Sequence, residues 1–388
     1  MMLCRFLRRA LGPVGLLALA SVACDENRRP ESGAAARVAP TVDGADGSAP
    51  LQPRPKDNRD GWAGPKPRPP RTRIAVTLQP LRAMGPSGSD APVENPVDLR
   101  FSHLGLLISD YGTLDVRVYN STTGELVRRI GRYGRGPWEF VMPPSIIGTY
   151  ADPLLLEASV GRLHELSRLP NNGTTTMNRA RQWITGCRMP SGHLLTQASA
   201  SPVGMEYYVS EIGGSARLVD SSHHPIARIQ SLGFFVRQTA VRQVDDSTCG
   251  YFPAYHEDWA LAEADGSLRV AAAVESLPPA SMITEPTARG ARFMVNAEAR
   301  SGHVDSRAWR DFVILLFQGT TRERNRILDF YDRRTLAYVG TVVLPHHATR
   351  IAVHKDTLAV VEEIDEEPRV RLYLLVSELG QRPLSYDR

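Results

Sequence analysis

Short apolar runs separated by polar turns dominate the chain, and the clearest example lies between residues 104 and 148. Three runs, Leu104–Asp110, Val116–Asn120 and Thr123–Val127, precede a glycine-rich corner at Gly131–Phe140 and a further run at Ser145–Gly148. Runs of this length bounded by Gly, Asp, Asn and Ser are typical of β-strands. We find no long segment with apolar residues at helical spacing. The pattern predicts an all-β fold made of small sheets.

The turn at Asn120–Leu126 has loose counterparts at Asp220–Ile226 and Asp332–Tyr338, and an alternating strand precedes each. An Asn or Asp that closes a strand can accept a hydrogen bond from its own backbone two residues on, which starts a turn. One such unit cannot bury both of its faces, so a ring of similar units is expected.

At about 50 residues per blade, residues 72–388 accommodate a six-bladed β-propeller. We expect Thr72–Leu78 to pair with Val370–Leu375. Pairing the two ends of the chain in one blade would close the ring and remove a free sheet edge.

The N-terminus has the organisation of a signal peptide over residues 1–23. A cationic start at Arg5, Arg8 and Arg9 precedes the apolar stretch Leu11–Ala20 and the small residues Ser21–Ala23. The following cysteine resembles the lipidated residue of the bacterial lipoprotein lipobox, although leucine is expected where Ser21 stands. We expect lipid attachment at Cys24, with simple secretion as the alternative.

Residues 24–71 are rich in proline, glycine, alanine and charge, with prolines crowded between Pro53 and Pro70. Such a composition cannot bury enough apolar surface to offset backbone ordering, so it predicts a disordered tether. The expected organisation is a signal peptide over 1–23, a tether over 24–71 and a propeller over 72–388. The expected location is the bacterial cell envelope, with the lipid anchor in a membrane and the domain facing the periplasm or the cell surface.

The glycine-rich corner resembles a motif of bacterial six-bladed β-propellers of the NHL-like type, including secreted and lipid-anchored proteins. The matching residues are Gly131, Gly134, Gly136, Pro137, Glu139 and Phe140. One extra residue lies between the first two glycines, and Trp138 replaces the usual glycine. The resemblance implies the fold and, more generally, a role in binding proteins or ligands, with occasional enzymes.

Two cations and two aromatic residues alternate in this corner, and such a set can hold an anionic or ring-bearing ligand. They are Arg132, Tyr133, Arg135 and Trp138. The alternative is structural, because arginine stems can cover apolar blade edges while their charged ends stay in water.

No catalytic or metal-binding motif stands out, so we name no catalytic residue, no metal ligand and no cofactor. The function expected is that of an envelope-anchored module, monomeric, binding an unknown protein or small ligand at a face of the propeller. The alternative is a calcium-dependent hydrolase or lactonase-like enzyme with Asp110, Glu157 or Asp311 around the central channel. The net charge of +4 is thinly spread, which argues against nucleic-acid binding.

Cys187 and Cys249 remain after Cys4 and Cys24 are assigned to the signal peptide and the lipid anchor. An oxidising compartment permits a disulfide between them. Two separate buried thiols are the alternative that the sequence leaves open.

Overall fold

The computed structural model describes the folded part of the chain from Pro70 to Ser377. The described residues are 70–85, 92–168, 174–176, 182–189, 191–201, 204–210, 216–220, 239–263, 267–278, 280–287, 290–296, 299–318 and 323–377. The expected signal peptide, the lipid site at Cys24 and the tether before residue 70 lie outside this part. No helix among the described residues is long and apolar enough to cross a membrane.

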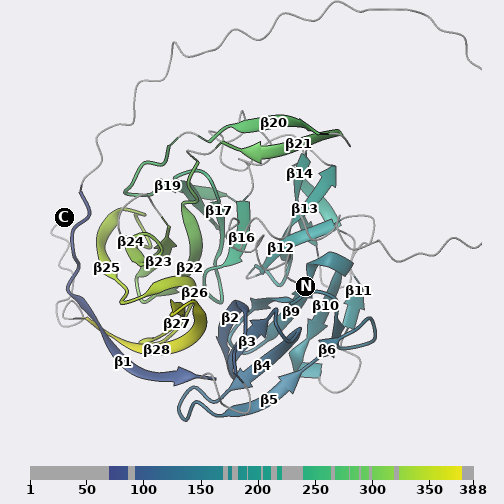
Figure 1. The fold of residues 1–388 in the computed structure, drawn as a ribbon, viewed down its shortest axis with the longest axis horizontal. Coiled ribbons are helices and arrows are strands. Elements are labelled where there is room, and N and C mark those ends of the chain that lie inside the picture. Colours follow the sequence, from purple (N-terminus) through teal and green to yellow (C-terminus); the bar gives the residue numbers. More distant parts are fainter. Residues whose placement is uncertain are drawn as a thin grey trace, which may run out of the picture. The chain divides into compact units, whose positions relative to one another are not determined.

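The described chain forms six four-stranded antiparallel sheets (Figure 1). Five of them are meanders of consecutive strands, and the sixth adds one strand from the start of the described chain. The first contains β2 (Pro96–Ser102), β3 (Gly105–Asp110), β4 (Asp115–Tyr119) and β5 (Leu126–Ile130). The second contains β8 (Ser145–Gly148), β9 (Pro153–Glu157), β10 (Arg162–Glu165) and β11 (Thr174–Thr176). The third contains β12 (Gln182–Arg188), β13 (Leu194–Ser201), β14 (Gly204–Ser210) and β15 (Ala216–Asp220).

In the fourth and fifth sheets the strands again follow chain order, whereas the last strand of the sixth comes from the start of the described chain. The fourth contains β16 (Thr239–Gln243), β17 (Cys249–Pro253), β18 (Asp258–Ala262) and β19 (Leu268–Ala272). The fifth contains β22 (His303–Trp309), β23 (Phe312–Phe317), β24 (Ile327–Asp332) and β25 (Tyr338–Val343). The sixth contains β26 (His347–His354), β27 (Thr357–Ile364), β28 (Glu367–Ser377) and β1 (Val76–Met84).

Smaller elements connect the sheets or the strands within a sheet. A parallel pair joins β6 (Arg132–Tyr133) to β7 (Glu139–Phe140), and a hairpin joins β20 (Met282–Thr287) to β21 (Gly290–Val295). Two single-turn 3₁₀ helices span Ala158–Val160 and Leu166–Arg168.

The sheets are arranged as a β-propeller, because their first strands contact one another in a closed cycle. The cycle runs β2, β8, β12, β16, β22, β26 and back to β2. In Figure 1 the labelled members of this set surround the middle of the ring, and the later strands lie farther out. The all-β prediction and the propeller fold are thus confirmed.

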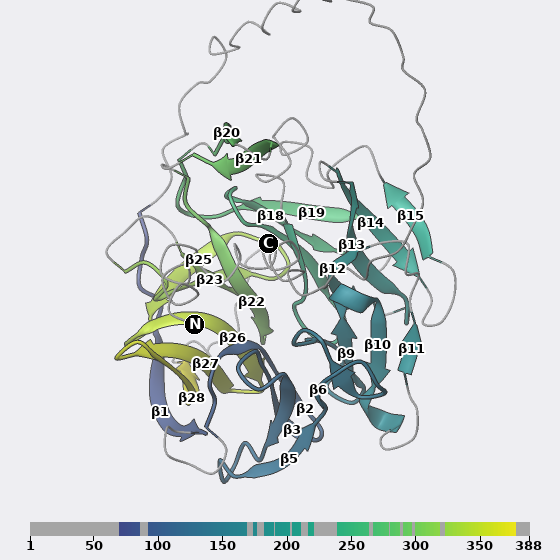
Figure 2. The same cartoon turned by 45° about the vertical axis from the view of Figure 1, so that its right-hand side comes forward.

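The ring closes through the two ends of the folded chain, as the sequence predicts. Strand β1 pairs antiparallel with β28, with Leu78 opposite Leu375 and Met84 opposite Val370. Figure 2 shows the two strands side by side. The closing strand begins at Val76 rather than Thr72, and as the outermost strand it accommodates Pro80, which lacks a backbone N–H.

Arg71 belongs to the folded domain, although the sequence analysis assigns it to the tether. Its guanidinium pairs with the buried Asp329 at 2.9 Å and with Glu275. It also lies over the ring of Phe317, 5.4 Å from the ring centroid. A removable tether must therefore end before Arg71.

The two described turns that the sequence predicts from a closing Asn or Asp are confirmed. Asn120 Oδ1 accepts hydrogen bonds from the amides of Thr122 and Thr123 at 2.8 and 3.1 Å. Asp332 Oδ1 likewise accepts hydrogen bonds from the amides of Arg334 and Thr335. Each turn leads into the outermost strand of its sheet; the third counterpart, after Asp220, lies outside the described residues.

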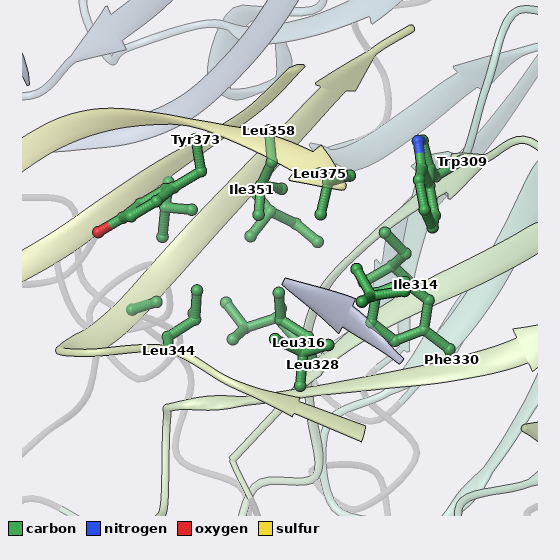
Figure 3. Packing of buried hydrophobic residues seen from close by; sticks show 14 residues of the cluster. Trp309, Ile314, Leu316, Leu328, Phe330, Leu344, Ile351, Leu358, Tyr373 and Leu375 are labelled. Carbon is green, nitrogen blue, oxygen red and sulfur yellow. The ribbon is translucent and has the colours of Figure 1, made fainter. Parts of the chain in front are cut away.

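Apolar side chains from facing sheets fill the space between them. Figure 3 shows the cluster between the fifth and sixth sheets, where Trp309, Leu316 and Phe330 meet Ile351 and Leu375. All five are at most 2% exposed. Burying one such side chain contributes about 1.5–3 kcal/mol, so packing between neighbouring sheets stabilises the ring.

Cys187 and Cys249 form a disulfide that joins β12 to β17, with their Cα atoms 5.8 Å apart. Both side chains are buried in a small apolar cluster with Leu195 and Tyr251. The bridge therefore links the third and fourth sheets across their interface.

Replacing either cysteine with alanine is expected to lower the free energy of unfolding by about 2–4 kcal/mol, because the cross-link closes a long loop. The double variant should lose no more than either single variant, since one cross-link can be removed only once. Urea unfolding measures the losses, and mass spectrometry of unreduced peptides detects the link. Additive losses, or unlinked peptides, would contradict the bridge.

Candidate functional site

Side chains on the first strands tie each sheet to the next around the inner edge of the ring. Strands β2, β12 and β22 each carry an irregularity in their pairing, and the residue after it accepts a backbone hydrogen bond from the following sheet. Asp98 accepts from the amide of Ile146 at 2.8 Å, and Asp305 accepts from that of Ile351 at 2.9 Å. Thr185 receives the corresponding bond from β16. These links fix polar side chains at the inner edge.

Four arginines from different sheets gather with two of these aspartates. We call the group the inner-strand cluster, and its members are Asp98 and Arg100 of β2, Arg242 of β16, Asp305 and Arg307 of β22, and Arg350 of β26.

The two aspartates share the arginines unevenly. Asp305 Oδ1 lies 2.9 Å from Arg307 Nη1 and 3.5 Å from Arg242 Nη1. Asp98 Oδ1 lies 3.5 Å from Arg307 Nη2. Arg350 Nε instead donates to the carbonyl oxygen of Val97 at 2.5 Å, which ties β26 to β2. The six residues include four cations and two anions, and Asp246 gives Arg100 a further partner at 3.4 Å.

Burial and the neighbouring charges shift the pKa values of these side chains. Burial, together with the neighbouring Arg307, lowers the pKa of Arg100 to about 10. Burial and the nearby Arg242 likewise lower the pKa of Arg350 to about 10. Burial would raise the pKa of Asp305, but the surrounding arginines outweigh it and hold that pKa below its ordinary value. The pKa of Asp98 lies above its ordinary value, because there burial dominates.

Several guanidinium nitrogens in the cluster lack acceptors. The Nε atoms of Arg100, Arg242 and Arg307 are buried and have no hydrogen-bond partner among the described residues. An unsatisfied buried donor costs about 1–3 kcal/mol, and more when it is charged. The side chain of Arg242 is 18% exposed, so solvent reaches the group. Buried cations with spare donors are the features expected of a site that receives an anion.

A pair of stacked rings lies beside the cluster. The rings of Tyr150 and His354 are 4.1 Å apart and nearly parallel. The amide of Tyr150 donates to Asp246 Oδ1 at 2.7 Å, and the same oxygen lies 3.4 Å from Arg100 Nη2. Burial and the adjacent Lys355 lower the pKa of His354, which favours a neutral ring. The stack therefore adds an aromatic surface next to Arg100.

The structure does not bring the four predicted corner residues together. Arg132 and Tyr133 are exposed, and so is Arg135. Trp138 instead packs inward, 5.0 Å from the ring of His164 between ring centroids. The backbone of Trp138 is left-handed, with a φ of 58°. Glycine adopts this conformation most easily, and glycine is the usual residue here in the family that the corner resembles.

Other residues of the corner have structural roles. Glu139 accepts hydrogen bonds from the amide of Gly136 at 2.8 Å and from Arg132 Nε at 2.9 Å. Phe140 is fully buried between the first two sheets. A Cβ at Gly131 would lie 2.2 Å from the ring of Phe140, so this position requires glycine.

The three carboxylates named for a calcium-dependent enzyme lie in separate surroundings. Asp110 accepts from the amides of Glu94, Asn95 and Gly112. Glu157 pairs with Arg162 at 2.6 Å, and Asp311 lies in the turn before β23. Among the described residues, no group of three or more His, Cys, Asp or Glu side chains could hold a metal ion.

Sequence reasoning missed the inner-strand cluster, although one signal for it is visible. The pattern Asp-x-Arg occurs in two of the first strands, as Asp98–Arg100 and as Asp305–Arg307. Arg242 and Arg350 have no such neighbour. Their contribution depends on which sheets meet at the inner edge.

Comparison with known proteins supports the fold alone. No family model and no curated protein matches the chain. An exported protein of Bacteroides fragilis has a similar structure, with a TM-score of 0.50, 11% identity, and 78% of this chain and 96% of that chain covered. Virginiamycin B lyase of Staphylococcus aureus gives a TM-score of 0.46 at 10% identity, covering 78% and 100%. The β-propeller domain of Cps50 (Swd1) from Myceliophteria thermophila gives 0.44 at 10% identity, covering 77% and 100%.

Proposed function

We propose that this protein is an envelope-anchored, six-bladed propeller that binds a small anionic ligand at the inner-strand cluster. Each four-stranded sheet is one blade in this proposal, the tether begins at Cys24 and ends before Arg71, and Cys24 carries the lipid. An exported location is supported by the Bacteroides protein of the same fold. The observation that carries the binding function is the excess of buried arginine over aspartate at the inner strands.

An anion would correct two deficits of this cluster at once. It would offset part of the burial and of the repulsion from neighbouring arginines that together lower the pKa of Arg100 and of Arg350. It would also accept hydrogen bonds that the guanidinium groups of Arg100 and Arg242 do not make within the described chain. Carboxylate and phosphate groups fit the planar guanidinium with two parallel hydrogen bonds. The ligand class is therefore a carboxylate or phosphate compound.

The calcium-dependent hydrolase has no comparable support. Asp110 and Glu157 lie in different sheets and already have internal partners, and Asp311 lies in the turn before β23. We therefore propose a binding module rather than that enzyme.

Citrate and inorganic phosphate are suitable probes for the proposed site. At about 100 times its dissociation constant, a ligand stabilises the folded state by about 2.7 kcal/mol, so one of the two should raise the melting temperature of the wild type. The variant with Arg100→Gln and Arg242→Gln should lose most of this rise, because the two Nε donors that lack acceptors are removed together with their charges.

Arg310→Gln is the matched control, because Arg310 is 42% exposed, lies in the turn after β22 and pairs with Asp356 rather than with a member of the cluster. It should keep the full rise. Calorimetric titration with the same probes separates binding from general salt effects. An equal response of all three proteins would reject the site.

A further inference from the structure

A second cationic surface lies on the outer edge of the first sheet and on the corner that follows it. We call it the basic rim, and it consists of Val127, Arg128, Arg132, Tyr133 and Arg135. Val127 is 61% exposed and Tyr133 is 70% exposed, and the side chain of Arg132 is 81% exposed. Figure 1 places β5 and β6, which carry four of these residues, at the outer margin of the ring.

The backbone beneath the rim is held firmly from inside. Arg162 donates to the carbonyl oxygens of Arg135 at 3.1 Å and Gly136 at 2.9 Å, and also to that of Glu139. Its own charge is balanced by the buried Glu157 at 2.6 Å. Tyr133 and Arg135 therefore project from an ordered corner, which reduces the entropy cost of a contact made there.

Two carboxylates lie on or beside the rim, and each accepts hydrogen bonds from neighbouring residues. Glu139 serves the amide of Gly136 and Arg132. Glu125, before the rim, accepts a hydrogen bond from Thr123. The rim thus presents three guanidinium groups, of which that of Arg132 is paired with Glu139, interspersed with one aliphatic and one phenolic side chain.

We propose that the basic rim docks on an anionic lipid surface. Arginine and tyrosine both suit the boundary between lipid headgroups and acyl chains, where one end of the side chain is apolar and the other polar. The exposed apolar groups are single side chains separated by cations, whereas a protein interface usually has a continuous apolar core. An outer sheet edge also fits a broad surface better than a narrow ligand.

The test uses the full chain with Cys24→Ser, which cannot be acylated at that position. Cosedimentation is measured with vesicles of phosphatidylcholine alone and with vesicles that also contain phosphatidylglycerol. Binding should require the anionic lipid and decrease at high salt. The added triple change Arg128→Gln, Arg132→Gln and Arg135→Gln should weaken it by about fivefold for each arginine, the factor that corresponds to about 1 kcal/mol per basic residue.

The matched control carries Arg73→Gln, Arg324→Gln and Arg334→Gln, which removes the same charge from other exposed positions. It should bind nearly as well as the parent. Tyr133→Ser should weaken binding without changing its salt dependence. Equal losses in both triple variants, equal binding to neutral vesicles, or displacement of the protein from anionic vesicles by short duplex DNA would overturn the proposal.

This proposal is independent of the inner-strand site. The rim variant should keep the rise in melting temperature produced by the small anion, and that result also shows that the variant is folded.

Discussion

Asp305→Asn is expected to lower the free energy of unfolding by about 3–5 kcal/mol, the range measured when one partner of a buried ion pair is removed. Asp305 is fully buried and lies against Arg307 and Arg242, which would then repel each other without a counter-charge. Asparagine keeps the shape and can still accept the hydrogen bond from the amide of Ile351. The loss therefore reports charge rather than packing. Denaturant unfolding with an unchanged m-value measures it.

Asp98→Asn is the matched control for this change. Asp98 accepts the equivalent hydrogen bonds, from its neighbour Leu99 at 2.9 Å and from Ile146 at 2.8 Å. Its pKa is raised by burial, whereas that of Asp305 is lowered, so its charge contributes less to stability. Asp98→Asn should cost clearly less than Asp305→Asn. Equal costs would show that the excess of arginine is not what distinguishes the two positions.

Glu157→Gln is expected to have an effect of similar size, about 3–5 kcal/mol, because it leaves Arg162 largely buried without its anion. Glu157 is fully buried, pairs with Arg162 at 2.6 Å and accepts from the amide of Val141 at 2.7 Å. Arg162 in turn holds the corner backbone. Thermal and urea unfolding measure the loss.

The dependence of this loss on pH has a definite sign. Burial would raise the pKa of Glu157, but His164, the Val141 amide and Arg162 outweigh it and hold the pKa below its ordinary value. Its contribution is therefore present above the ordinary glutamate range and is lost as the pH falls through the lowered pKa. The difference between wild type and variant should shrink in acid. A difference that stays constant would mean that Glu157 acts by shape alone.

A second change separates the ion pair from the packing around it. The double variant Glu157→Gln with Arg162→Met should recover part of the loss, because no buried charge remains unpaired. If the double variant is no more stable than Glu157→Gln alone, the cost comes from the corner hydrogen bonds of Arg162 instead.

The inner-strand cluster illustrates how binding and stability can oppose each other. Arg100 and Arg350 carry charge at neutral pH although burial and like charges disfavour it. A bound anion would supply the missing compensation. Without a bound anion, the buried arginines lower the stability of the folded state. Such a loss of stability is common at functional sites.

The sequence by itself determined the local features of this fold. Strand spacing and the turns at Asn120 and Asp332 depend on neighbours along the chain, so their hydrogen bonds follow from residue type. The pairing of the two chain ends could also be predicted from the sequence, because a ring of sheets leaves an edge that the terminal strands can close. The need for glycine at Gly131 was also recognisable, because it belongs to a short glycine-rich turn.

Only the tertiary structure decided which distant side chains meet. Arg242 and Arg350 are unremarkable in their own strands, and they join Asp305 because three sheets converge at the inner edge. Trp138 was predicted with the exposed cations but packs inward, since burying its ring against His164 outweighs a left-handed backbone. Arg71 lies in a composition typical of a tether, yet Asp329, 258 positions away, holds it in place. Contacts between distant residues depend on sheet order and register, which a pattern of local polarity does not contain.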